Sequence, residues 1–295
     1  MHERTRMKHL RSLLVLVTLG SIVLLASSCR IRAGTDDGGS LPIASSEGVE
    51  ILFAGHSFFI PIAKSFEVLA REKGLLSSQD IGFVFAGGAA GLPGALWQNA
   101  SRKSAIEAAL STGQVELFGL TGFGDSLGSF EDYERWFDLA LGHNPQTTFF
   151  IGQPWMVRGP SLETAAFDLA IETTAQRLHE VVIELRDAYP DNTILFLNYG
   201  KVSSVMMREF EEGMLPDIEG LVPDPLNGVS LDEALFSDAV LGHAGPMMTQ
   251  LTALTWIDLL LGADIGSFNY SDYESDVEAI LQEVLLYNEQ YLDAP

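Results

Sequence analysis

Five short runs of mainly apolar residues recur along the chain, at positions 49–54, 81–86, 115–120, 147–151 and 193–197. Their apolar residues are largely continuous rather than alternating, and each run leads into glycine or a polar segment. Runs of this kind are typical of parallel strands whose two faces are both covered by other elements. The pattern therefore predicts five buried strands in a mainly parallel sheet.

Segments with a helical spacing of apolar residues fill the gaps between these runs. One begins at Ser129, where Ser-Phe-Glu-Asp resembles a capping box, and it places Tyr133, Trp136 and Phe137 on one face. The other predicted helices span 61–75, 93–110, 161–188, 202–212 and 246–261. This alternation predicts a three-layer α/β/α sandwich around a doubly wound sheet. Functional sites in such folds lie beyond the carboxyl ends of the strands.

The first 28 residues have the character of an export signal. Basic residues precede an apolar run at 13–26, which is too short for a comfortable span of a hydrocarbon core about 30 Å thick. Cys29, the only cysteine in the chain, follows Ser28. The segment 25–29 resembles a bacterial lipobox, although Ala26 stands where the motif prefers leucine. The resemblance implies lipid attachment at Cys29 and retention at a membrane surface; an ordinary signal cut after Ser28 is the alternative.

The remainder divides into a tether and one folded unit. From Ala33 to Gly48 the sequence turns to glycine, serine and aspartate with almost no periodic apolar pattern, which predicts a flexible tether over residues 29–48. Residues 49–295 show no internal repeat and no further linker, and their length suits a single α/β domain.

Charge excludes several classes of function. The full chain carries a net charge of −23, and loss of residues 1–28 would leave 13 Lys and Arg against 39 Asp and Glu, a net charge of −26. Such an acidic protein should repel nucleic acid and anionic lipid, so no nucleic-acid partner is expected and the membrane is met only through the anchor. Neutral substrates fit better than polyanionic ones. With 47% hydrophobic residues the chain should also fold.

The first predicted strand runs directly into Gly55, His56 and Ser57, and Pro61 is well placed to start the next helix. Gly55 permits a tight turn, and the helix amino terminus offers backbone donors near Ser57. These conditions favour a nucleophilic hydroxyl. A serine that merely caps the helix is the alternative.

An acid and an imidazole stand together before the last predicted helix, as Asp238 and His243. A nucleophilic serine needs a base, and the base needs a carboxylate to fix its tautomer. We therefore expect His243 to be the base and Asp238 its partner, with Asp232 as a reserve acid. His56 is set aside because neighbouring side chains after a strand tend to point apart, and His143 because it follows a helix end.

A glycine-rich segment, 86–91, follows the second predicted strand. Its backbone can approach a ligand closely, as in loops that bind oxyanions. It lacks the residues of a phosphate-binding P-loop and the spacing of a dinucleotide fingerprint. A plain connecting loop is the alternative.

The order of these features resembles that of the SGNH, or GDSL-like, hydrolases. The GHSFF segment around Ser57 is similar to the first block of the family, Gly87 or Gly88 takes the place of the second-block glycine, and His243 matches the base of the last block. The resemblance implies a flavodoxin-like fold in which Ser57 is the nucleophile. It also implies an oxyanion hole made by backbone amides of Ser57 and the glycine.

Two departures from the family stand out. The third block normally reads Gly-x-Asn-Asp, whereas residues 120–125 contain no asparagine. We expect Thr121, Gln153 or another backbone amide to supply the missing oxyanion donor. The acid of the family stands three residues before the histidine, whereas Asp238 stands five before His243, which requires a different connecting loop.

Aromatic and amide residues end the fourth and fifth predicted strands: Gln153, Trp155, Asn198 and Tyr199. Placed at the rim of the same cleft, they would suit a sugar, because aromatic faces stack on pyranose rings and amides bond hydroxyl groups. The same residue types also close cores and line acyl pockets.

The sequence thus predicts an exported, surface-anchored serine ester hydrolase, an esterase or a carbohydrate O-deacetylase, whose partner is a small-molecule or glycan ester. No cofactor or metal is expected. Cation binding by acidic loops such as 272–276 is a weaker alternative, because scattered carboxylates in an acidic protein mostly form a solvated surface and no calcium-loop pattern is present. The alternative is a non-catalytic lipoprotein that binds a sugar or small ligand in the same cleft.

Overall fold

The computed structural model describes residues 50–76, 81–122, 128–155 and 161–292. The chain divides into two units, 1–40 and 41–295, and all of the described residues belong to the second. The predicted signal, Cys29 and the whole of the predicted tether lie outside the described residues. Within the described ranges, no helix has both the length and the apolar character needed to cross a bilayer.

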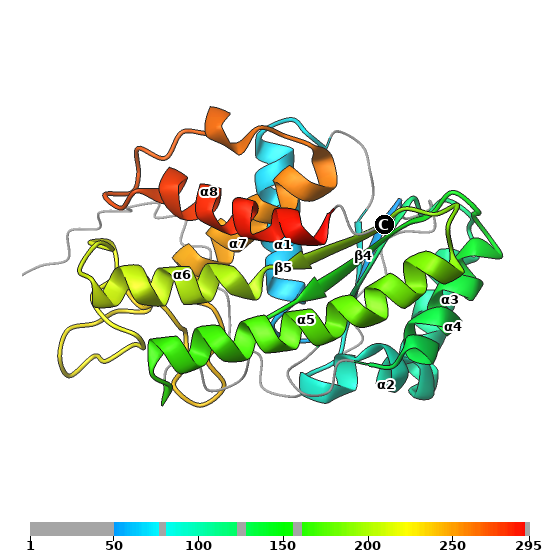
Figure 1. The fold of residues 1–295 in the computed structure, drawn as a ribbon, viewed down its shortest axis with the longest axis horizontal. Coiled ribbons are helices and arrows are strands. Elements are labelled where there is room, and N and C mark those ends of the chain that lie inside the picture. The colour runs from blue at the N-terminus through cyan, green and yellow to red at the C-terminus, as the bar shows by residue number, and fades with distance from the viewer. Residues whose placement is uncertain (1–49, 77–80, 123–127, 156–160, 293–295) are drawn as a thin grey trace, which may run out of the picture. The chain divides into compact units, whose positions relative to one another are not determined.

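The five predicted strands form one parallel sheet. They are β1 (Ile51–Gly55), β2 (Ile81–Phe85), β3 (Leu117–Thr121), β4 (Thr148–Gln153) and β5 (Ile194–Asn198). The order is β2-β1-β3-β4-β5, and every neighbouring pair is parallel (Figure 1). This is the doubly wound order of flavodoxin-like folds, so the predicted fold class is confirmed.

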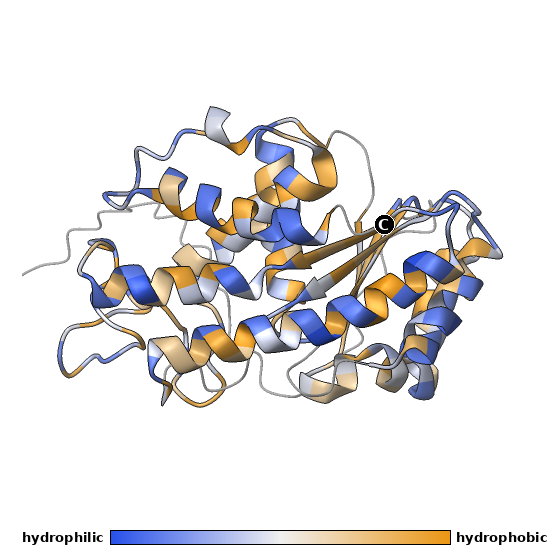
Figure 2. Ribbon diagram, in the orientation of Figure 1, coloured by the Kyte–Doolittle hydropathy of each residue, from blue (hydrophilic) through white to orange (hydrophobic). Residues whose placement is uncertain are grey.

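Helices cover both faces of the sheet. The main ones are α1 (Ile60–Glu72), α2 (Pro93–Gln98), α3 (Ala100–Leu110), α4 (Phe130–Leu141), α5 (Thr164–Ala188), α6 (Gly200–Glu211), α7 (Pro246–Leu261) and α8 (Val277–Asn288). One core cluster joins α1, α6, α7 and α8 to the sheet, and the other joins α2, α3, α4 and most of the buried side of α5. The strands are hydrophobic, as burial between two layers of helices requires, whereas the helices carry both hydrophobic and hydrophilic residues (Figure 2).

Two helix predictions were incomplete. The segment 93–110 is two helices rather than one, because Asn99 has an extended backbone and its side chain accepts a hydrogen bond from the N–H of Arg102 at 3.2 Å. Asn99 thereby caps α3 and separates it from α2. Helix α8 was not predicted; the side chain of Asp276 caps it by accepting from the N–H of Ala279. The capping box at Ser129 and Asp132 is present as predicted.

A glycine in the central strand β3 leaves room for aromatic side chains of the two neighbouring strands, β1 and β4. A Cβ atom on Gly119 would lie 2.4 Å from Cδ1 of Phe53 and 3.3 Å from Cδ1 of Phe150. These rings also pack on Trp256 of α7, with centroids 5.6 Å and 4.8 Å away. The missing side chain therefore makes room for the aromatic core between the sheet and α7.

We expect Gly119→Ala to lower the free energy of unfolding by about 1–3 kcal/mol, because an added methyl group overpacks this core. Denaturant unfolding followed by tryptophan fluorescence measures the change. Gly87→Ala is the matched control, since a Cβ atom there meets nothing within 4 Å and φ is −69°. Equal stability of Gly119→Ala and wild type would show that the aromatic cluster is not tightly packed.

Candidate functional site

Ser57 lies where the order of the sheet reverses. Strand β1 pairs with β2 on one side and β3 on the other, and a ligand crevice forms at this point in open α/β sheets. The turn after β1 is closed by the N–H groups of Phe59 and Ile60, which donate to the carbonyl of His56 at 3.0 and 2.9 Å. Ser57 is partly exposed at its start.

The structure brings Ser57, His243 and Asp238 into one hydrogen-bonded series. Nε2 of His243 lies 2.8 Å from Oγ of Ser57, and Nδ1 lies 2.7 Å from Oδ2 of Asp238. A carboxylate only accepts, so the network assigns the proton to Nδ1 and leaves Nε2 free to accept from the serine hydroxyl. The reserve acid, Asp232, is exposed, and Asp238 is the residue that bonds His243.

The carboxylate of Asp238 also organises the loop that carries His243. Its Oδ1 accepts from the N–H groups of Val240, Leu241 and Gly242 at 3.0, 2.6 and 3.2 Å, and Oδ2 accepts from the N–H of His243 at 3.3 Å. The long Asp–His spacing is therefore accommodated by a closed turn around one carboxylate.

Two further contacts close this turn at its base. Ser237 N–H donates to the carbonyl of His243 at 2.8 Å, next to an isolated antiparallel bridge between Phe236 and Ala244.

The hydrogen bonds to Asp238 lower the pKa of its carboxyl group. Partial burial would raise this pKa, but the donors of Leu241, His243 and Gly242 outweigh the effect of burial. The acid is thus held in its ionised form.

His56 has a structural role that the sequence did not predict. Its ring is completely buried; Nδ1 accepts from the N–H of Phe58 at 3.2 Å, and Nε2 donates to the carbonyl of Gly122 at 2.9 Å. The neutral ring thus ties the turn after β1 to the end of β3. Burial, reinforced by the nearby His243, lowers the pKa of His56 to about 4, although the bond to Gly122 opposes this.

Backbone donors without a partner in the described part of the chain follow the carboxyl ends of β1 and β2. The N–H groups of Ser57, Gly87 and Gly88 donate to no acceptor among the described residues. A Cβ atom at Gly87 or Gly88 would meet nothing within 4 Å, so space is open over this loop. At Gly91, by contrast, a Cβ atom would lie 2.7 Å from Cβ of His56, which places the glycine loop directly against the end of β1.

Thr121 does not supply the missing oxyanion donor through its side chain. The residue is completely buried, and its Oγ1 lies 2.9 Å from both the carbonyl of Gly122 and that of Gly152. Its single hydroxyl proton is used between β3 and β4, because a buried hydroxyl needs a partner. Thr121 lies at the end of strand β3, as predicted, but its side chain is directed toward the carbonyl of Gly152 and is not available to a substrate.

The expectation that two aromatic residues form the rim of a cleft is corrected. Trp155 and Tyr199 are both buried. The indole N–H of Trp155 donates to the carbonyl of Gly242 at 2.6 Å, and the hydroxyl of Tyr199 donates to the carbonyl of Phe58 at 2.9 Å. Both use their polar atoms to hold the backbone beside Ser57 and His243, so neither offers a ring face to a sugar.

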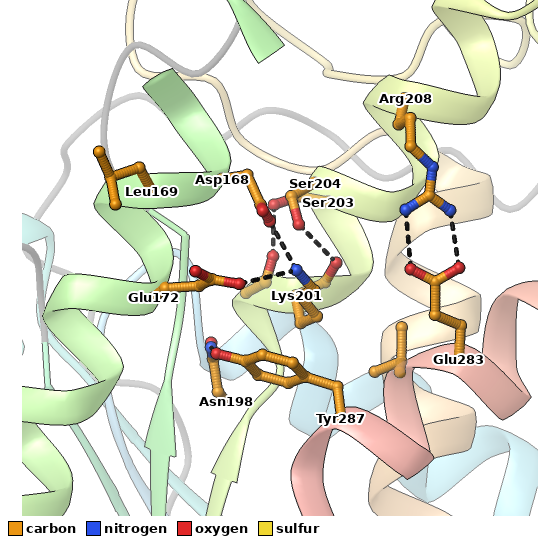
Figure 3. Close-up of polar contacts among 12 residues, drawn as sticks. Asp168, Leu169, Glu172, Asn198, Lys201, Ser203, Ser204, Arg208, Glu283 and Tyr287 are labelled. Carbon is orange, nitrogen blue, oxygen red and sulfur yellow. Dashed lines mark hydrogen bonds and ion pairs between the residues drawn. The ribbon is translucent and has the colours of Figure 1, made fainter. Parts of the chain in front are cut away.

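The two amides expected at the rim are also buried. Nε2 of Gln153 donates to the carbonyl of Pro154 at 2.7 Å, and Oδ1 of Asn198 makes no hydrogen bond in the described part of the chain. Asn198 lies beside a polar cluster of α5, α6 and α8, with Nδ2 3.5 Å from the hydroxyl of Tyr287 (Figure 3). Neither amide side chain is exposed toward the serine.

The centre of that cluster is Lys201, which is held between two helices. Its Nζ lies 2.7 Å from Asp168 and 3.3 Å from Glu172, and 4.6 Å from the centre of the Tyr287 ring (Figure 3). Burial would lower the pKa of Lys201, but the two carboxylates outweigh it and raise the pKa. The cluster thus connects α5, α6 and α8.

The described residues contain no group of three or more His, Cys, Asp or Glu side chains that could hold a metal ion.

The stability of the protein should depend on the titration of His56. In the unfolded chain this group has its ordinary pKa of 6.5, whereas burial lowers it to about 4 in the folded state. Between these values the unfolded state binds the proton more readily, so stability falls as the pH falls. The expected loss is about 3 kcal/mol between pH 7 and 4.

Chemical denaturation over this pH range in wild type and His56→Gln measures the contribution. The variant should be less stable at pH 7, because it disturbs the hydrogen bond to the carbonyl of Gly122. Its stability should, however, fall less steeply toward pH 4. Parallel curves for the two proteins would contradict the assignment of His56 as a buried neutral base.

No protein-family model and no curated protein gives a significant match to the chain. Among solved structures, the chain is similar to the periplasmic domain of a lipopolysaccharide acetyltransferase from Salmonella ser. Paratyphi A, with 12% sequence identity and a TM-score of 0.32. The similarity covers 50% of this chain and 66% of that domain.

Proposed function

We propose that the protein is a serine ester hydrolase in which Ser57 is the nucleophile, His243 the general base and Asp238 its orienting acid. The hydrogen-bonded series from Ser57 through His243 to Asp238 carries this proposal, because it joins positions 186 residues apart in the order that acyl transfer requires. Together with the GHSFF segment, this series leads us to propose that the chain is a divergent relative of the SGNH hydrolases. From the signal-like residues 1–28 and the lipobox-like segment 25–29 we propose that it is exported and lipid-anchored through Cys29.

The reaction follows from the direction of these hydrogen bonds. Oγ of Ser57 attacks the ester carbonyl while Nε2 of His243 takes the hydroxyl proton, and the ionised Asp238 stabilises the imidazolium. Collapse of the tetrahedral intermediate releases the alcohol, which receives that proton from Nε2. Water then loses a proton to His243 as it attacks the acyl-enzyme, and the proton returns to Ser57 when the acid leaves.

The oxyanion would be held by the backbone N–H groups of Ser57 and Gly88, with Gly87 as the neighbouring alternative. Their lack of a partner among the described residues supports this role. The family's third donor, an asparagine side chain, has no counterpart among the predicted residues, since the Thr121 hydroxyl is bonded elsewhere. Loss of one donor typically costs about 10²- to 10³-fold in rate, so we expect a slow enzyme.

The best-supported substrates are small neutral acyl esters. The open space over Gly87 and Gly88 leaves room for a substrate beside the glycine loop, and the net charge of −23 disfavours polyanions. A glycan ester loses its main support, because the expected aromatic platform is buried. A non-catalytic ligand-binding protein would have no need of the Ser57–His243–Asp238 series.

A fluorophosphonate probe and a p-nitrophenyl acetate assay test the proposal together. Wild type should be labelled at Ser57 and should turn over the ester, whereas Ser57→Ala should lose labelling and His243→Ala should lose turnover by at least about 10³-fold. Ser203→Ala, which removes a buried hydroxyl that donates to the carbonyl of Gly200 at 2.6 Å, serves as the control. Equal labelling of wild type and Ser57→Ala would reject Ser57 as the nucleophile.

Asp238→Asn should separate the two tasks of the carboxylate. The amide oxygen can still accept from the loop, but its NH₂ group would face two donors of His243, the ring Nδ1–H and the backbone N–H. We expect kcat to fall by about 10²- to 10⁴-fold, with the fold retained as judged by circular dichroism. Wild-type kcat in this variant would show that the carboxylate acts on the loop alone.

A further inference from the structure

Trp155 connects the end of strand β4 to the loop that carries His243. Only 1% of its surface is exposed, and its indole N–H donates to the carbonyl of Gly242 at 2.6 Å. Gly242 directly precedes His243, so this bond holds the backbone one residue away from the proposed base. Because β4 is an inner strand of the sheet, the indole is fixed to a rigid part of the fold.

The same indole also contacts the segment that carries Ser57. The ring of Phe58 packs edge-on against Trp155, with centroids 5.2 Å apart, and lies 4.6 Å from the ring of His243. The backbone of Phe58 is fixed separately by the hydroxyl of Tyr199. Trp155 therefore bonds the loop of His243 and packs on the residue that follows Ser57.

We propose that Trp155 is a positioning residue that sets the distance between His243 and Ser57; this inference rests on the proposed function. The bonds from Asp238 fix the shape of the loop and the Asp238–His243 pair, but they all lie within the loop. They do not determine where the loop lies relative to Ser57. The bond from Trp155 to Gly242 connects the loop to the sheet and supplies that constraint.

Loss of this bond should leave the Asp238–His243 pair intact and move it as a unit relative to Ser57. Displacements of about 1 Å at a catalytic group can lower a rate about 10²-fold. We therefore expect kcat to fall about ten- to a hundred-fold while KM stays nearly constant, because the constraint acts on the reacting atoms and not on substrate binding. Labelling by a fluorophosphonate should slow by the same factor.

Two variants test the role of the N–H group. Trp155→Phe keeps an aromatic ring but removes the donor, and replacement of Trp155 by its benzothienyl analogue, in which sulfur takes the place of the N–H, keeps the shape of the side chain. Both should lose kcat as stated. The analogue decides the matter if Trp155→Phe folds poorly, because its packing is unchanged.

Trp136→Phe is the matched control. Its indole is also buried and donates to a backbone carbonyl, that of Pro93 at 2.9 Å, but it belongs to the core cluster on the other face of the sheet. It should lower Tm as Trp155→Phe does while kcat stays within about two-fold of wild type. An equal loss of kcat in Trp136→Phe, or wild-type kcat in the benzothienyl variant, would overturn the inference.

Failure of the positioning role of Trp155 can be distinguished from failure of the proposed function. If wild type shows no Ser57-dependent turnover or labelling, the proposed function fails, and the role of Trp155 fails with it. If wild type turns over the ester and Ser57→Ala does not, but the benzothienyl variant of Trp155 behaves as wild type, only the positioning role is wrong.

Discussion

The arrangement of the molecule depends on the burial of both faces of one parallel sheet. Strands that are apolar on both sides cannot be exposed to water, so each connection must carry a helix back across the sheet. This constraint brings every carboxyl end to the same edge. Ser57 and the glycine loop, which follow β1 and β2, thus lie at the same edge as the ends of β3, β4 and β5, although they come from distant parts of the sequence.

Polar groups at that edge mostly serve to fix backbone. His56, Thr121, Trp155 and Tyr199 are buried, and each bonds a main-chain carbonyl of a neighbouring segment. Buried polar atoms are stable only with partners, and here the partners belong to the segments around the serine and the histidine. The residues expected to bind substrate, Trp155 and Tyr199, therefore support the backbone of the site, while Ser57 and His243 are partly exposed.

Sequence reasoning was sufficient for the features that depend on chain order. Apolar runs predicted the five strands, and the positions of Ser57, Asp238 and His243 relative to them predicted that the three side chains could meet. The directions of single side chains could not be predicted from the sequence in the same way. Nothing in the pattern shows that Tyr199 turns inward or that Trp155 reaches Gly242, because these contacts depend on segments 141 and 87 residues away. The break at Asn99 was missed because its capping role competes with helix propensity only locally.

The closed turn from Asp238 to His243 has a consequence for how such a site tolerates change. Acid and imidazole share a single short peptide whose amides converge on one carboxylate, so their mutual alignment is encoded locally rather than by the assembly of distant segments. Insertions before Phe236 or after Ala244 would leave this dyad whole, whereas a one-residue change within the turn would disturb both partners at once. The Asp238–His243 turn could therefore be transferred to another fold as one segment. Only the contacts that connect the turn to the sheet would have to be rebuilt there.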